Sequence, residues 1–321
     1  MKAVRIHEQG PPEVLRYEEV PEPSPKEDEV LVKMKAIGVN FTDVYTRSGV
    51  YPAKLPLTLG VEGAGVVSAV GGNVTAAAVG DSVAYTNVMG AYSEYAAVPA
   101  SRLVKLPRGL DPKVAAAVLL QGMTAHYLVH DTFPLERGHK VLIHAGAGGV
   151  GQLLVQMAKQ IGAYVIATTS TEEKARVART AGADAVIVYT KQDFEEEVKR
   201  ITGGRGVNVV YDSVGKATFE KSLRCLLPRG YLVLYGQSSG IVPPVAPSAL
   251  QKGSLFLTRP MLGDYTATDD ELQRRARDVF SSVLSGKLKF SVFRTLHLSQ
   301  AVKAHRLLEG RKTTGKLLLI P

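Results

Sequence analysis

A glycine-rich turn between a short apolar run and a helical pattern constrains the fold of this chain more than any other feature. Residues 141–145 are β-prone, the glycines Gly146, Gly148 and Gly151 follow, and residues 152–162 carry apolar side chains on one helical face. A second β-prone run covers residues 164–167, so the segment 140–167 is close to the length of a βαβ unit. Small residues at such a turn let a pyrophosphate approach free N–H groups at the positive end of a helix. The segment predicts a dinucleotide site, and a tight turn without a nucleotide is the alternative.

The end of the second predicted strand bears on which dinucleotide is bound. Residues 167–171 contain no acid that could accept a hydrogen bond from a ribose 2′-hydroxyl, and Glu172 and Glu173 suit the first turn of a helix instead. Lys174 comes four residues after Ser170, so a hydroxyl and an ammonium are predicted to face a 2′-phosphate. This pattern favours NADPH over NADH. The alternative is that Lys174 is an ordinary solvated helix residue.

The chain has an ordinary composition for a globular protein. Its 321 residues are 45% hydrophobic and 21% charged, enough for two domains. The first residues lack the continuous apolar core of a signal peptide and no run is long enough to cross a bilayer, so we expect a cytoplasmic protein. Cys225, the single cysteine, excludes an intrachain disulfide and a multi-thiolate zinc site, and its apolar surroundings favour a core position.

The formal net charge of +9 raises nucleic acid as a partner. However, the lysines and arginines are spread along the chain, and no stacking motif of an RNA-recognition fold is visible. A polyanionic cofactor accounts for part of the charge, so RNA binding stays a minority hypothesis.

The rhythm of the sequence changes near residue 123. Residues 1–123 contain short β-like runs separated by Pro and Gly, such as 29–36, 63–70 and 82–85, which predict a small barrel-like domain. Residues 124–267 alternate strands with helices, which predicts a doubly wound parallel sheet. The further strands are predicted at 185–189, 207–211, 231–235 and 255–258. A helix after Asp269 and a last strand at 316–320 are predicted to complete the first domain within residues 268–321.

This arrangement resembles the zinc-free quinone oxidoreductases of the medium-chain dehydrogenase/reductase superfamily. The resemblance covers essentially the whole chain, in segments that follow one another in the family's order. They are residues 38–45, 47–51, 59–65, 145–151, 210–215, 236–240 and 252–260. The resemblance implies an α/β architecture: a GroES-like β-rich barrel domain, a Rossmann domain, and a cleft between them that holds NADPH.

The resemblance also bears on metal binding. The zinc alcohol dehydrogenases of the same superfamily carry a Cys ligand where this chain has Asn40, and they carry Gly-His-Glu where it has Gly60-Val61-Glu62. The cysteine-rich lobe that binds structural zinc is absent as well. Without a Lewis acid to polarise an alkoxide oxygen, we expect a substrate that accepts hydride readily, such as a quinone or a conjugated carbonyl.

The resemblance assigns two groups of site residues. The substrate group consists of Asn40, Asp43, Tyr45, Tyr51 and Arg259. The cofactor group consists of Thr42, Thr124, Gly148, Gly149, Val150, Gly151, Ser170, Lys174, Tyr189, Gly236, Gln237, Ser238, Ser239 and Arg311. Within the cofactor group, Gly148 to Gly151 should cover the pyrophosphate, and Ser170, Lys174, Tyr189 and Arg311 should surround the 2′-phosphate. Thr124 and residues 236–239 should line the nicotinamide half.

The role of each substrate-group residue stays open. Tyr45 and Tyr51 can stack on a flat quinone or donate a proton to its oxygen, or they can simply form the wall of the site. Arg259 precedes a proline and is more often structural than catalytic in such a place, with an acid as the expected partner.

Two classes of function remain in play, an enzymatic class and a non-enzymatic one. The first is an NADPH:quinone oxidoreductase, with an NADPH-dependent alkenal or enone reductase as its neighbour; a reductase of enoyl thioesters is a more distant relative. The non-enzymatic alternative is an NADPH-binding protein that binds RNA or serves a structural, crystallin-like role. A homodimer is expected from the family, through the sheet edge near residues 255–258.

Overall fold

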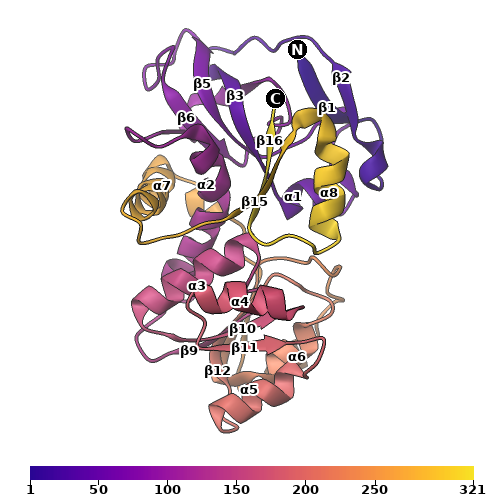
Figure 1. Ribbon diagram of the computed structural model, residues 1–321, viewed down its shortest axis with the longest axis vertical. Coiled ribbons are helices and arrows are strands. Elements are labelled where there is room, and N and C mark those ends of the chain that lie inside the picture. Colours follow the sequence, from indigo (N-terminus) through magenta and orange to yellow (C-terminus); the bar gives the residue numbers. More distant parts are fainter. The chain divides into compact units, whose positions relative to one another are not determined.

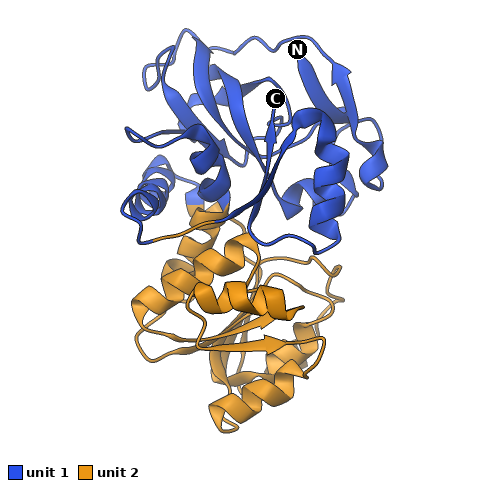
Figure 2. Cartoon of the chain, in the orientation of Figure 1, with its two compact units in different colours: residues 1–120, 266–287, 291–321 blue, residues 121–265, 288–290 orange.

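The computed structural model describes the whole chain, residues 1–321. It contains two compact units, which Figure 2 colours separately. Unit 1 comprises residues 1–120, 266–287 and 291–321, and unit 2 comprises residues 121–265 and 288–290. No helix in the chain combines the length and the apolar character needed to cross a membrane.

Unit 2 is built on a six-stranded parallel sheet in the order β11-β10-β9-β12-β13-β14. Its strands are β9 (Lys140–Ile143), β10 (Tyr164–Thr169), β11 (Ala185–Val188), β12 (Val207–Asp212), β13 (Leu226–Leu234) and β14 (Phe256–Thr258). The first strand, β9, lies between β10 and β12, so the order of the strands reverses at this point. Ligands of such sheets bind beside that reversal, at the carboxyl ends of the strands. The doubly wound parallel sheet predicted from the sequence is confirmed.

Helices cover both faces of this sheet (Figure 1). The helices of unit 2 are α3 (Gly149–Ile161), α4 (Glu172–Thr180), α5 (Phe194–Thr202) and α6 (Phe219–Arg224), with a π-helical turn at Leu128–Thr132 and a 3-10 turn at Pro247–Leu250. The long helix α2 (Pro112–Tyr127) precedes them in the chain. In Figure 1, α3 and α4 lie on one side of the sheet and α5 and α6 on the other.

The single cysteine is part of the hydrophobic core of unit 2. Cys225 directly follows α6 and is fully buried among apolar side chains such as Phe219 and Leu232. Burial raises the pKa of its thiol to about 12, so it is a core residue and not a thiolate nucleophile. The core position predicted for Cys225 thus follows from its place between α6 and β13.

Unit 1 is β-rich. A seven-stranded sheet has the order β15-β16-β3-β5-β6-β8, with β7 also paired to β3, and a smaller sheet has the order β2-β1-β4. The strands are β1 (Lys2–Ile6), β2 (Arg16–Glu19), β3 (Glu29–Val39), β4 (Leu57–Thr58), β5 (Glu62–Val70), β6 (Ser82–Thr86), β7 (Tyr95–Pro99), β8 (Leu103–Lys105), β15 (Val292–His297) and β16 (Lys316–Ile320).

Three helices lie wholly within unit 1: α1 (Phe41–Arg47), α7 (Asp269–Leu284) and α8 (Ala301–Glu309); the first part of α2, up to residue 120, also belongs to it. Short 3-10 turns occur at Pro12–Val14, Ala100–Arg102, Asp264–Thr266 and Leu298–Gln300. The last strand, β16, pairs antiparallel with β3, so the end of the chain completes the sheet begun by its first hundred residues. The long central strand β3 thereby touches β5, β7 and β16, and apolar residues from all of these strands share one core.

Candidate functional site

The glycine-rich turn joins β9 to α3 and requires its glycines for steric reasons. A Cβ added to Gly151 would lie 2.2 Å from the carbonyl oxygen of Ala145, and one added to Gly146 would lie 2.7 Å from the Cβ of Ala167. Ala145 itself adopts a left-handed φ of 54°, which sharpens the turn. The turn therefore packs closely against itself and β10, as a dinucleotide-binding turn does.

Gly148 stands at the N-cap of α3 and brings no capping side chain. The first N–H groups of the helix, at Gly149, Val150 and Gly151, therefore have no intrahelical acceptor. They lie at the carboxyl edge of the sheet, beside the reversal of strand order. An anionic pyrophosphate fits this place, because it would accept those hydrogen bonds and meet the positive end of the helix dipole.

The residues predicted around the 2′-phosphate lie at the ends of β10 and β11, but not for the reason given by their spacing. Helix α4 begins at Glu172 with Thr171 as its cap, so Ser170 lies outside the helix and does not share a helical face with Lys174. The helix starts at Glu172, where the acidic residues predicted its first turn, and the capping hydroxyl of Thr171 accepts from the N–H of Lys174. The four-residue spacing of Ser170 and Lys174 therefore does not place them on one helical face.

Strand pairing, not helical spacing, brings the 2′-phosphate candidates of unit 2 together. The N–H of Tyr189 donates to the carbonyl of Thr169, and the hydroxyl of Thr190 donates to the carbonyl of Ser170. Glu172 pairs with Lys191 at 3.2 Å, so a second lysine, which the sequence did not single out, lies beside this edge. Arg311 lies in unit 1, in the exposed turn after α8, whereas Ser170, Lys174 and Tyr189 lie in unit 2.

The segment predicted to line the nicotinamide half packs on the loop after β12. The N–H groups of Ser238 and Ser239 donate to the carbonyls of Ser213 and Val214 at 3.1 and 2.8 Å. A Cβ on Gly236 would lie 2.6 Å from the Ser213 carbonyl oxygen, so this approach also requires glycine. The loop after β13 and the loop after β12 are thus in direct contact at the carboxyl edge of the sheet. Gln237 lies between the residues that make these contacts. Thr124, the remaining candidate for this half, is a nearly buried residue of α2.

In unit 1 the candidate Asn40 belongs to a buried ionic cluster. Its side-chain amide donates to Glu62 Oε2 at 2.9 Å, and its Oδ1 accepts from Lys316 Nζ at 2.7 Å. Lys316 also pairs with Glu62, and both side chains are at most 1% exposed. A buried carboxylate needs a partner charge, and here the ammonium from β16 supplies it. Neither Glu62 nor Lys316 stood among the predicted site residues.

Asp43 caps the start of α1 and is fully buried. Its Oδ2 accepts from the N–H of Asn40 at 2.8 Å and from the hydroxyl of Tyr92 at 3.0 Å, whereas its Oδ1 has no hydrogen-bond partner. Burial raises the pKa of this carboxyl to about 7, against the lowering effect of those two hydrogen bonds. Asp43 therefore changes charge near neutral pH.

A directed row of hydrogen bonds ends on Asp43. Arg47 lies 3.2 Å from His305 Nδ1, and His305 Nε2 lies 3.1 Å from the hydroxyl of Tyr92. A guanidinium cannot accept, so Nδ1 accepts, Nε2 carries the proton and donates to Tyr92, and Tyr92 donates to Asp43. Burial, reinforced by Arg47, lowers the pKa of His305 to about 3, so its imidazole is neutral. Arg47 in turn pairs with Glu309 on α8 at 2.7 Å, which fixes the end of α1.

The two predicted tyrosines contact each other. The rings of Tyr45 and Tyr51 meet edge to face with centroids 5.3 Å apart, and the N–H of Tyr51 donates to the carbonyl of Tyr45. Thr42 lies one turn before Thr46 on the same helix, and its carbonyl accepts the Thr46 hydroxyl. Asn40, Thr42, Asp43 and Tyr45 thus share α1 and its cap, and Tyr51 packs beside them.

Arg259 lies in unit 2, directly after β14. Its guanidinium donates to the carbonyl of Leu234 at 3.0 Å, so a backbone carbonyl is its partner where the sequence suggested an acid. That expectation was wrong because the carbonyl of Leu234, the buried last residue of β13, lies within reach of the guanidinium, while no ion pair to Arg259 forms.

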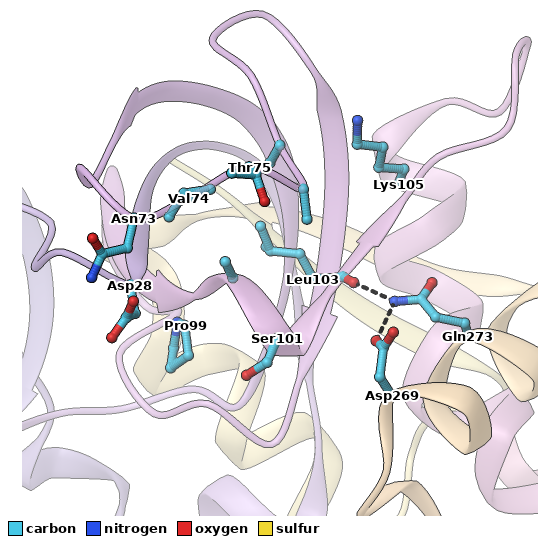
Figure 3. Close-up of a pocket in the computed structure, with 13 residues that line it drawn as sticks. Asp28, Asn73, Val74, Thr75, Pro99, Ser101, Leu103, Lys105, Asp269 and Gln273 are labelled. Carbon is cyan, nitrogen blue, oxygen red and sulfur yellow. Dashed lines mark hydrogen bonds between the residues drawn. The ribbon is translucent and has the colours of Figure 1, made fainter.

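A cavity of about 800 Å³ in unit 1 is lined by none of the predicted site residues; Figure 3 shows the residues that do line it. It is bordered by the loop between β5 and β6, by the turn before β8 and by α7. Gln273 spans one side of it by donating to the carbonyl of Leu103 and to Asp269, as the dashed lines in Figure 3 show. No buried charged group points into this cavity, so we assign it no role.

Two family models match the chain, one in each half. The alcohol dehydrogenase GroES-like domain matches residues 26–108, and the zinc-binding dehydrogenase model matches residues 149–273. The GroES-like and Rossmann-like fold predicted from the sequence is thereby confirmed.

Known proteins resemble the chain over its full length. It is 46% identical to a quinone oxidoreductase of Pseudomonas aeruginosa over 100% of this chain and 99% of that protein. It is 44% identical to a 2-haloacrylate reductase of a Burkholderia species, over 99% of this chain and 98% of that protein. Among solved structures, Escherichia coli quinone oxidoreductase complexed with NADPH superposes with a TM-score of 0.98 at 43% identity, with 100% of both chains covered.

Proposed function

We propose, because the chain belongs to the quinone oxidoreductase family of the medium-chain dehydrogenase/reductase superfamily, that it reduces quinones with NADPH. The observation that carries this proposal is the glycine turn at the reversal of strand order, together with the end of β10, where residues 167–171 contain no acid for a ribose 2′-hydroxyl. The Escherichia coli relative that superposes on the chain is described as complexed with NADPH.

Unit 2 would hold the cofactor, and it fits an anionic dinucleotide on its own geometry. Residues 148–151 would bind the pyrophosphate through backbone N–H groups, Ser170, Lys174 and Tyr189 would surround the 2′-phosphate, and residues 236–239 would orient the nicotinamide half. NADPH, when bound, supplies the hydride, so the protein needs to bind, orient and exclude water. Arg311 from unit 1 is proposed to add a charge to the 2′-phosphate.

Unit 1 would supply most of the substrate site through α1. The buried ionic cluster holds Asn40, and Tyr92 holds Asp43, through hydrogen bonds. The start of α1 is therefore fixed, and with it the position of Tyr45 on that helix. We propose that Tyr45 and Tyr51 form an aromatic wall for a flat quinone and that either hydroxyl can protonate the reduced oxygen. Arg259, already bonded to a carbonyl, is proposed to shape the site and not to act as an acid or base.

The reaction is proposed to need no metal. Asn40 and Val61 stand where zinc-dependent relatives place a Cys and a His ligand, and the ammonium of Lys316 donates to Asn40 and to Glu62, the neighbour of Val61. A cation so close to Glu62 competes with a metal for the same oxygens. Treatment with a chelator should therefore leave activity intact, and stoichiometric zinc in the purified protein would contradict this proposal.

An alkenal or enone reductase is the second candidate, and one observation favours it: the 2-haloacrylate reductase relative is nearly as similar as the quinone oxidoreductases. Conjugated carbonyls and quinones both accept hydride to give a delocalised anion. The first assay mixes the protein with NADPH or NADH and follows nicotinamide absorbance after a quinone or an enone is added. Rapid NADPH oxidation by quinone supports the main proposal, and a preference for the enone supports the second.

Lack of turnover with both acceptors, despite tight NADPH binding, would support the non-enzymatic alternative. RNA affinity that falls steeply with salt concentration would then favour RNA binding over a structural role.

We also propose a cytoplasmic homodimer. Strand β14 is an edge of the parallel sheet, and Phe256 on it is 48% exposed while it stacks on Tyr231. An exposed edge with an aromatic side chain can pair with the same edge of a second copy. Sedimentation of the purified protein tests this proposal, and a Phe256→Lys variant should sediment as a monomer.

A further inference from the structure

A row of buried side chains links the ends of three neighbouring strands in unit 2. His144 directly follows β9, and its ring nitrogens lie 2.9 Å from the hydroxyls of Thr168 on β10 and Ser222 on α6. The Ser222 hydroxyl lies 3.3 Å from the carboxylate of Asp212, the last residue of β12. All four side chains are at most 1% exposed, so these are bonds made without competition from water.

The bonds in this row have a definite direction. Burial lowers the pKa of His144, so its imidazole is neutral and carries one N–H. The Ser222 hydroxyl donates to Asp212, and it therefore accepts from His144 Nε2–H. The other ring nitrogen, Nδ1, must then accept from Thr168. Donation thus runs from Thr168 through His144 and Ser222 to Asp212, and loss of one hydroxyl leaves its neighbour unpaired.

At each end of the row, a residue forms hydrogen bonds with a loop at the carboxyl edge of the sheet, where the cofactor is proposed to bind. The Asp212 carboxylate accepts from the N–H groups of Val214 and Gly215 at 2.7 and 3.0 Å, and so fixes the loop on which residues 238 and 239 rest. At the other end, the carbonyl of Thr168 accepts from the N–H of Gly146 in the glycine turn. Thr168 also lies two residues before Ser170, at the edge assigned to the 2′-phosphate.

We propose that His144 is a positioning residue that couples the 2′-phosphate end of the NADPH site to its nicotinamide end. This inference rests on the cofactor contacts proposed above. Binding of the 2′-phosphate half reduces the mobility of the strand end that carries Thr168. Through the hydrogen bonds of His144, the loop held by Asp212 also becomes less mobile. The nicotinamide half then binds to a site that is already formed. Because the ring is only 1% exposed, we do not propose that it contacts the cofactor itself.

Two fragments of the cofactor test this coupling without any turnover. Adenosine 2′,5′-bisphosphate represents one half and reduced nicotinamide mononucleotide the other. Calorimetric titration of each, alone and with the other at saturation, gives their mutual effect on affinity. We expect each fragment to strengthen the other about threefold to tenfold in the unaltered protein, the range expected for one net hydrogen bond.

Two variants break the row at different bonds, and a third provides the control. Thr168→Val removes the donor to Nδ1, and Ser222→Ala removes the link to Asp212. Thr169→Val makes the same chemical change on the next residue of β10, where the hydroxyl bonds only to the carbonyl of Thr171. We expect Thr168→Val and Ser222→Ala to abolish the coupling, the double variant to lose no more than either single one, and Thr169→Val to keep it.

Some results would overturn the proposal. They are coupling that persists in Thr168→Val, coupling that is absent from the unaltered protein, or equal loss in Thr169→Val. A lower thermal midpoint with unchanged coupling would show that the row only supports the fold, and would overturn it as well. Because fragment binding needs no quinone, failure of the coupling and failure of the proposed reductase activity are separate outcomes.

Discussion

Replacing Asp43 by asparagine should change how the stability of the protein depends on pH. In the unfolded chain the carboxyl of Asp43 has the ordinary pKa of an aspartate, 3.8, and burial raises this pKa to about 7 in the native state. The difference corresponds to about 4 kcal/mol, at 1.36 kcal/mol for each pKa unit. Asparagine cannot ionise and resembles the protonated acid, so the variant lacks this contribution.

The sign follows from where the proton is bound. Below pH 3.8 both states hold the proton, so Asp43 costs nothing. Between pH 3.8 and about 7 the native state keeps a proton that the unfolded chain has lost, so the free energy of unfolding falls as pH rises. Above about pH 7 the carboxylate is buried in ionised form and the full cost is present.

The assay is urea unfolding of both proteins across this range. Between about pH 5 and about pH 8 the unaltered protein should lose about 3 kcal/mol more than Asp43→Asn, an upper value for a buried group. The comparison uses the pH dependence and not the absolute stability, because the new amide N–H lacks an acceptor at Oδ1's place and costs about 1–3 kcal/mol at every pH. His305 has a lowered pKa and contributes a slope of opposite sign to both proteins, so it cancels in the difference.

A second variant sharpens the test. Tyr92→Phe removes a hydrogen bond that lowers the pKa of Asp43, so the loss of stability should extend to higher pH. Parallel pH profiles for the unaltered protein and Asp43→Asn would refute the reasoning, since they would mean that Asp43 is ionised in the native state across the whole range or is reached by water.

Three further predictions concern the two units separately. Lys174→Ala should weaken NADPH about 10- to 100-fold in titrations while barely changing NADH, and equal loss for both would remove Lys174 from the 2′-phosphate site. Lys316→Met should cost about 3–5 kcal/mol in urea unfolding because Glu62 loses its buried partner, and adding Glu62→Gln should recover most of it; additive losses would contradict this. Gly151→Ala should weaken NADPH at least about tenfold, since its Cβ would collide with a carbonyl oxygen 2.2 Å away, and unchanged affinity would exclude the turn as the pyrophosphate site.

The parts of the fold predicted well from the sequence are those set by local periodicity and backbone sterics. The glycine turn, the alternation after residue 123 and the last strand at 316–320 each follow from residues within a few positions of one another. Helix α4 shows the limit of such local reasoning: its acidic first turn was predicted correctly, but the four-residue spacing of Ser170 and Lys174 does not place them on one helical face, because Ser170 precedes the cap at Thr171.

Other features of the site depend on contacts between residues far apart in the sequence, and only the tertiary structure shows them. Lys316 reaches Glu62 from 254 positions away, and His305 meets Tyr92 across 213. Nothing in the sequence marks these partners, because a buried charge or imidazole is recognised only by what surrounds it. The sequence thus determined the strands, helices and glycine turn through local conformational preference, whereas burial and pairing, which set the charge of Asp43 and the hydrogen bonds of His144, arose only when the strands were brought together.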